Sequence, residues 1–206
     1  MDTRVAAAGE QPLAARASPA ALLAEPGVRY FAGVIALAAL YRGAAEVGYA
    51  LQFAGPVGAI VWLPVGFGVA WLYRGGLRYW PGVLIGDLLA NDYTALPLGS
   101  ALGQTAGNVL EVLVIAMLLR ALVPRSGPLG SVKGLGMMVV AIAAGTTVSA
   151  TIGSLSLLAG DVTDIDGIPR IWRTWWLGDA SGALLVLPLA LAWARPPSRA
   201  SATSPA

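Results

Sequence analysis

Apolar residues run through most of this sequence in blocks of about 20, separated by short clusters of turn and basic residues. A block of that length, wound as a helix, matches the hydrocarbon thickness of a bilayer. Charged residues make up only 12% of the chain, well below their share in soluble domains. Short alternating strands are not seen, which argues against an outer-membrane barrel. We therefore predict an all-α fold, a polytopic transmembrane helical bundle.

Turn residues divide the apolar sequence into about six predicted spans. These spans cover residues 30–53, 57–73, 79–96, 99–122, 134–158 and 171–194. Residues 1–29 are Ala-rich with scattered charges and lack the compact apolar segment of a signal peptide, so we expect a flexible cytoplasmic tail. Residues 195–206 are rich in Pro, Ser and Ala, and we expect a disordered tail or a linker there.

Basic residues gather on one side of the predicted membrane. Six spans place both termini on the same side, and the opposite side receives only Arg170 and Arg173, beside the acidic residues 161–166. Cytoplasmic loops of membrane proteins are enriched in Lys and Arg. Both termini are therefore predicted to be cytoplasmic, in a multi-pass membrane protein. The basic residues on the predicted cytoplasmic side are Arg4, Arg16, Arg29, Arg74, Arg78, Arg120, Arg125, Lys133, Arg195 and Arg199.

Several ionisable and amide side chains lie inside the predicted spans, where each charge costs roughly 2.5–3.5 kcal/mol on insertion scales. Arg42 and Glu46 are four residues apart, so they share a helix face and are predicted to form an ion pair. The remaining polar residues of the spans are Asp87, Asn91, Asp92, Gln104, Asn108, Glu111 and Asp179.

Their spacing predicts which of them meet. Asp87 and Asn91 share one helix face, while Gln104, Asn108 and Glu111 form one stripe on the next span. A short turn around Pro97 joins these two spans, so we expect an antiparallel hairpin with facing polar residues. With Asp179, these side chains would line a polar cavity that narrows inward from the extracytoplasmic side.

A second interpretation stays open for each of these residues. Buried amides and acids can serve only as interhelical hydrogen bonds, worth about 0.6 kcal/mol each. Trp175 and Trp176 can belong to an interfacial aromatic belt or form a stacking wall beside Asp179. Arg42 can neutralise one or two acids, so at least one other acid is expected to be protonated, to pair with Arg173 or to meet a cation.

Glycine and other small residues recur every four positions in several spans, which is typical of helices that pack closely in lipid. These positions are Gly82, Gly86 and Ala90; Gly99, Gly103 and Gly107; Gly145, Ser149 and Gly153; and Gly178 and Gly182.

The chain contains no Cys and no His. Thiol catalysis, disulfides, His-ligated haem, Ser-His catalysis and nearly all zinc sites are thereby excluded. Asp87 and Glu111 are the only plausible pair for aspartyl chemistry, and no recognised catalytic motif surrounds either. We therefore predict no catalytic residues, no metal, no cofactor and no nucleic-acid partner.

Four motifs in order along the chain resemble the MASE1 family of membrane-associated sensor domains. The first two are VWLPVGFG at residues 61–68, with a Trp-x-Pro-x-Gly pattern, and GGLRYWPG at 75–82. The third, GQTAGNVLE at 103–111, is similar to the Gly-Asn-x-x-Glu segment of that family. The fourth, WWLGDASG at 175–182, resembles its Trp-Trp-x-Gly-Asp-x-x-Gly block. Residues 30–194 are thus expected to form a MASE1-like sensory domain.

The resemblance implies an input domain of the bacterial inner (plasma) membrane. Such a domain relays a stimulus to a cytoplasmic output of histidine kinase or cyclic-di-GMP enzyme type, expected outside these 206 residues. Partners are expected to be the lipid bilayer, an unknown small ligand, and a second copy or a membrane partner protein. The alternative is a small transporter or a substrate-binding membrane subunit, since buried carboxylates also mark ion paths. The predicted ligand-binding residues are Trp62, Asp87, Asn91, Gln104, Asn108, Glu111, Trp175, Trp176 and Asp179.

Overall fold

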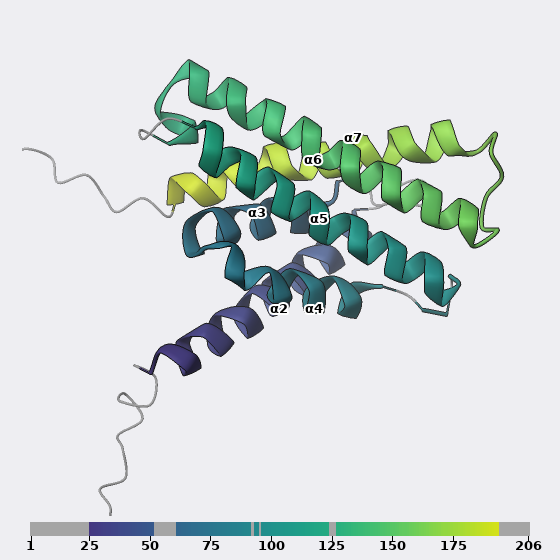
Figure 1. Cartoon of the computed structure of the whole chain (residues 1–206), viewed down its shortest axis with the longest axis horizontal. Coiled ribbons are helices and arrows are strands. Elements are labelled where there is room, and N and C mark those ends of the chain that lie inside the picture. Colours follow the sequence, from purple (N-terminus) through teal and green to yellow (C-terminus); the bar gives the residue numbers. More distant parts are fainter. Residues whose placement is uncertain (1–24, 52–60, 92, 95, 124–126, 194–206) are drawn as a thin grey trace, which may run out of the picture.

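The computed structural model describes residues 25–51, 61–91, 93–94, 96–123 and 127–193, and all regular structure in these ranges is helical (Figure 1). This confirms the all-α prediction. Both predicted tails lie largely outside the described residues. The α-helices are α2 (Pro26–Ala50), α3 (Leu63–Gly75), α4 (Trp80–Ala90), α5 (Leu98–Leu122), α6 (Val132–Ala159) and α7 (Ile168–Trp193). Two 3-10 turns, η1 (Leu77–Tyr79) and η2 (Pro128–Gly130), precede α4 and α6.

Four of the described helices, α2, α5, α6 and α7, are long and apolar enough to cross a membrane. The predicted spans at 57–73 and 79–96 were too long, because α3 has 13 residues and α4 has 11. A 13-residue helix rises about 20 Å, short of a hydrocarbon core of about 30 Å. The first span was placed too late, since α2 already begins at Pro26.

Local backbone geometry explains the two short helices. Trp62 has φ −89° and ψ 83°, outside the helical region, and its N–H donates to the Gly178 carbonyl of α7 at 2.9 Å. Pro64 then occupies the first turn of α3, where its missing N–H costs nothing. Helix α4 ends at Ala90 because the next residue, Asn91, is extended, with φ −69° and ψ 141°. Residues 57–60, 92 and 95 of these predicted spans lie outside the described part of the chain.

The helices pack as neighbouring pairs, with α5 against α6, α6 against α7, α3 against α7 and α2 against α4 (Figure 1). Small residues make these contacts close, as predicted. A Cβ at Gly82 would lie 2.8 Å from the Val34 carbonyl oxygen of α2, and one at Gly86 would lie 2.8 Å from that of Ala38. Gly99 is an exception, with nothing within 4 Å of an added Cβ.

Large apolar side chains cover much of the outer surface. Phe31, Ile35, Leu89 and Leu185 are all more than half exposed, and every long helix carries residues of this kind. A soluble monomer rarely shows so much apolar surface. The outer surface therefore fits a bundle surrounded by lipid.

One end of the bundle is basic. Arg120 of α5 donates to the Leu72 and Tyr73 carbonyls at the end of α3, at 3.4 and 3.1 Å. Tyr30 of α2 donates to the Arg78 carbonyl at 3.1 Å, which brings the first turns of α2 to the same end.

Candidate functional site

Asp87 of α4 is the centre of a buried hydrogen-bond network. Its Oδ1 accepts from the Tyr41 hydroxyl of α2 at 3.2 Å and from Asn108 Nδ2 of α5 at 2.8 Å. Its Oδ2 accepts from the Thr105 hydroxyl at 2.6 Å and from Asn91 Nδ2 at 3.3 Å. Four donors around a buried carboxyl group satisfy it without a basic partner.

Asn108 connects this centre to α6. Its side-chain amide donates to Asp87 and accepts, at Oδ1, from the Ser149 hydroxyl at 2.9 Å. Ser149 in turn lies beside the carboxyl groups of Glu111 and Asp179. We call the set Tyr41, Asp87, Asn91, Thr105, Asn108, Glu111, Ser149 and Asp179 the carboxyl network.

Glu111 and Asp179 form a pair of neighbouring acids within this network, contributed by the central turns of α5 and α7. Their side chains are almost completely buried, with exposed fractions of 0% and 3%. Both Glu111 carboxyl oxygens and Asp179 Oδ2 lack a hydrogen bond of good geometry among the described residues. Neither acid has an ion-pair partner there, and Arg173 is exposed. Such a pair can share a proton or accept a cationic or hydrogen-bond-donating ligand.

Most of the predicted ligand-binding residues thus lie in one connected set. Asn91 joins it through Asp87 and through Thr105, to which its Nδ2 donates at 2.8 Å. Trp175 lies beside Asp179 and against Gly153 of α6. Trp62 lies beside Tyr41 and meets the Tyr49 ring edge to face, with centroids 5.4 Å apart.

Four other predicted residues lie outside the network. Gln104 is half-buried, and its side chain makes no hydrogen bond to another described residue. Trp176 donates from Nε1 to Thr147, an exposed residue of α6, at 3.1 Å. Arg42 and Glu46 form the expected ion pair on α2, with side chains 38% and 57% exposed.

Sequence reasoning missed three members of the network, Tyr41, Thr105 and Ser149. Ser149 is one of the small residues that recur every four positions in α6, and that pattern predicts only a packing position. Thr105 lies three residues before Asn108, a helical spacing that could have identified it. Tyr41 offered no spacing signal, because its partner Asp87 is on another helix.

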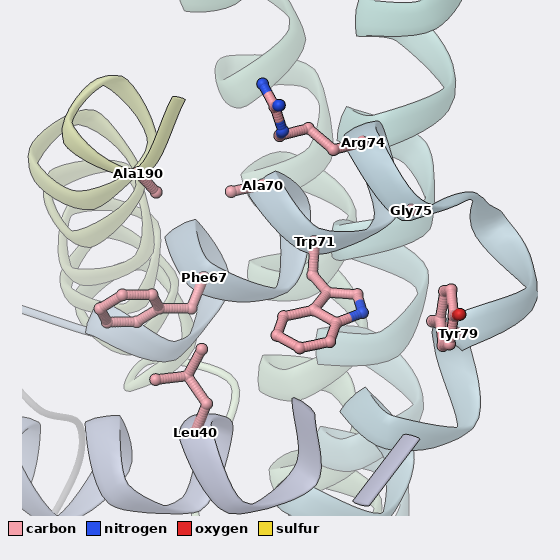
Figure 2. Close-up of a pocket in the computed structure, with 8 residues that line it drawn as sticks. All are labelled: Leu40, Phe67, Ala70, Trp71, Arg74, Gly75, Tyr79 and Ala190. Carbon is pink, nitrogen blue, oxygen red and sulfur yellow. The ribbon is translucent and has the colours of Figure 1, made fainter. Parts of the chain in front are cut away.

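A cavity of about 440 Å³ lies elsewhere in the molecule, between α2, α3 and α7 (Figure 2). Its lining includes Leu40, Phe67, Trp71 and Ala190 and none of the predicted ligand-binding residues.

Comparison with known proteins supports the motif resemblance. The "Probable diguanylate cyclase DgcE" of Escherichia coli (strain K12) is 30% identical over 142 residues, which are 65% of this chain and 12% of that protein. This chain therefore corresponds to a small part of that relative's length. No solved structure matches the chain. The MASE1 family profile matches residues 32–205, which include α3 to α7 and most of α2. This chain is a member of the MASE1 family of membrane sensory domains.

Proposed function

We propose that this chain detects a stimulus through the carboxyl network and relays it as a change in helix packing. The observation that carries the proposal is the Glu111–Asp179 pair, two neighbouring buried acids with three carboxyl oxygens that lack a hydrogen bond of good geometry among the described residues. Charged groups retained in a membrane interior are expensive and usually functional. A proton, a cation or a small polar ligand that reaches them would complete their hydrogen bonding.

The network offers a route from stimulus to packing, because its members come from α2, α4, α5, α6 and α7. A ligand can shift such a bundle only if it favours one packing state over another. Occupation of the Glu111–Asp179 pair would alter the contact between α5 and α7. Since α7 is the last described helix, we place the outgoing signal there.

Six membrane-inserted helices with both termini in the cytoplasm fit the charge distribution. In this arrangement α3 and α4 are too short to cross the membrane alone, and the helices packed against them hold them in place. The inner membrane of a bacterium is the proposed location. The diguanylate cyclase relative favours a cyclic-di-GMP output over a histidine kinase for the stimulus to control. The chain itself would act as an input domain without catalysis, as a homodimer or with a membrane partner.

A fusion to a diguanylate cyclase catalytic domain tests this proposal. Glu111→Gln and Asp179→Asn each replace an ionisable carboxyl group with an amide of the same shape. We expect either change to alter cyclic-di-GMP production in cells by about fivefold or more, the lower range of coupling between sites. Asp166→Asn, in the exposed loop before α7, is the matched control and should leave production unchanged. If all three variants produce as much cyclic-di-GMP as the parent under every condition, the network has no sensory role.

The same buried acids favour a second candidate, a small transporter or substrate-binding membrane subunit. Liposomes containing the purified chain distinguish the two. Protein-dependent flux of protons or cations that Glu111→Gln abolishes would support transport and overturn the sensory proposal.

A further inference from the structure

The cavity between α2, α3 and α7 forms a groove with an aromatic and aliphatic lining. Figure 2 shows Phe67 and Trp71 of α3 facing it, with Leu40 of α2 opposite and Ala190 of α7 at one side. Both α2 and α7 pack on α3, but they make little contact with each other. The groove occupies the space that these two helices leave over α3. We call it the α2–α7 groove.

The α2–α7 groove reaches the basic end of the bundle. Arg74, in the last turn of α3, belongs to its lining and is exposed, as is Gly75. Tyr79, another lining residue, has the Arg78 guanidinium over its ring at 5.1 Å from the centroid. A groove that is apolar along its length and cationic at one end is complementary to a molecule with an apolar chain and an anionic group at one end.

We infer that the α2–α7 groove binds an anionic phospholipid, with an acyl chain along Phe67 and Trp71 and the phosphate at Arg74. Charge complementarity selects the anionic class, since the lining contains Arg74 and no acidic residue. The occupant is a membrane lipid, because Leu40 and other exposed apolar side chains of α2 place this surface among acyl chains. The guanidinium has five N–H donors, so it can bind a phosphate in addition to its contacts within the protein.

This site is separate from the carboxyl network, because the two share no residue. An acyl chain lying between α2 and α7 would set the spacing of these helices. The inference therefore goes beyond the proposed sensing of a stimulus at Glu111 and Asp179. It adds regulation by the lipid composition of the membrane.

Native mass spectrometry of the purified full chain tests the inference, with phosphatidylglycerol and phosphatidylcholine of identical acyl chains as probes. We expect preferential retention of one phosphatidylglycerol. Arg74→Gln should weaken that retention about fivefold, because one basic residue contributes roughly that factor to the binding of an anionic lipid surface. Arg170→Gln changes an exposed arginine outside the groove and should have no effect. Equal retention of the two lipids, or equal loss in both variants, would overturn the inference.

A second variant tests the apolar part of the groove. Ala190→Phe places a ring where the acyl chain would lie, and the adjacent Leu189→Phe adds one on the exposed surface of α7. We expect only Ala190→Phe to reduce phosphatidylglycerol retention, with thermal unfolding showing that both variants fold. If glycerol phosphate competes as effectively as phosphatidylglycerol, the site binds the phosphate group alone, and the assignment to a lipid is overturned. Retention unchanged in Ala190→Phe would place the bound lipid outside the α2–α7 groove.

Discussion

The Thr105 hydroxyl donates a 2.6 Å hydrogen bond to Oδ2 of Asp87, and this bond ties α5 to the short helix α4. The same hydroxyl accepts from Asn91 Nδ2 at 2.8 Å, directly after α4 ends. One threonine thus holds both the acid at the centre of the network and the residue that terminates the helix.

Thr105→Val should therefore destabilise the bundle. The substitution keeps the shape of the side chain but removes a donor to Asp87 and an acceptor for Asn91. Interhelical hydrogen bonds in membranes contribute about 0.6 kcal/mol on average and up to about 1.7 kcal/mol, so we expect a loss near the upper figure. Unfolding in mixed micelles with increasing SDS measures the change. Thr174→Val is the control, because Thr174 is exposed and bonds to Arg170 of its own helix. Equal stability of the two variants would contradict the role given to Thr105.

Gly182→Ala should disrupt the packing of α3 on α7. An added Cβ would collide with the backbone of Trp62, where α3 begins, and backbone cannot move aside as a flexible side chain can. Overpacking of this kind costs roughly 1–3 kcal/mol. Gly43→Ala in α2 is the matched control, because nothing lies within 4 Å of its added Cβ. Thermal unfolding in detergent should show a lower midpoint for Gly182→Ala, and an unchanged or higher one for Gly43→Ala.

Arg42 and Glu46 should be strongly coupled if their exposed faces meet lipid. Removing one partner would leave a single charge in hydrocarbon, at roughly 2.5–3.5 kcal/mol on insertion scales. Arg42→Met and Glu46→Met should each destabilise the chain, while the double variant should be more stable than either. The same SDS unfolding experiment gives all three values. Additive losses would indicate that the pair is in water, where such pairs are worth about 0.3–0.5 kcal/mol.

The predicted topology can be tested with single cysteines, because the chain has none of its own. Val132, at the start of α6, and Thr163, between α6 and α7, lie on opposite sides of the proposed membrane. In intact spheroplasts, Thr163→Cys should react with an impermeant maleimide. Val132→Cys should react only after the membrane is opened. The reverse pattern would place the termini outside the cytoplasm.

Sequence patterns predicted the four long helices well, because their apolar length alone identifies them. The same rule failed for α3 and α4. The predicted spans included apolar residues before Leu63 and the polar residues that follow Ala90, but the contacts of Trp62 and Asn91 mark where α3 begins and α4 ends. Local apolar content carries no information about such contacts.

The spacing of polar residues in the sequence predicted part of the candidate site. Helical periodicity correctly grouped Asp87 with Asn91, and the hairpin argument correctly placed them opposite Asn108. From the sequence, Asp179 is expected in the same cavity as Glu111, but helical spacing alone could not show that the two carboxyl groups are direct neighbours, because that contact joins helices far apart in the sequence. The hydrogen-bonding role of Ser149 depended on the rotation of α6, which small-residue spacing leaves undefined.

The short lengths of α3 and α4 have a consequence for biogenesis. Neither segment is long enough to partition into lipid alone as the nascent chain leaves the translocon. Their insertion therefore depends on neighbouring helices, on α2, which is synthesised before them, and on α5 and α7, which follow. Substitutions at Gly82 or Gly182 would then lower the yield of inserted protein during synthesis, before any mature bundle exists to be weakened.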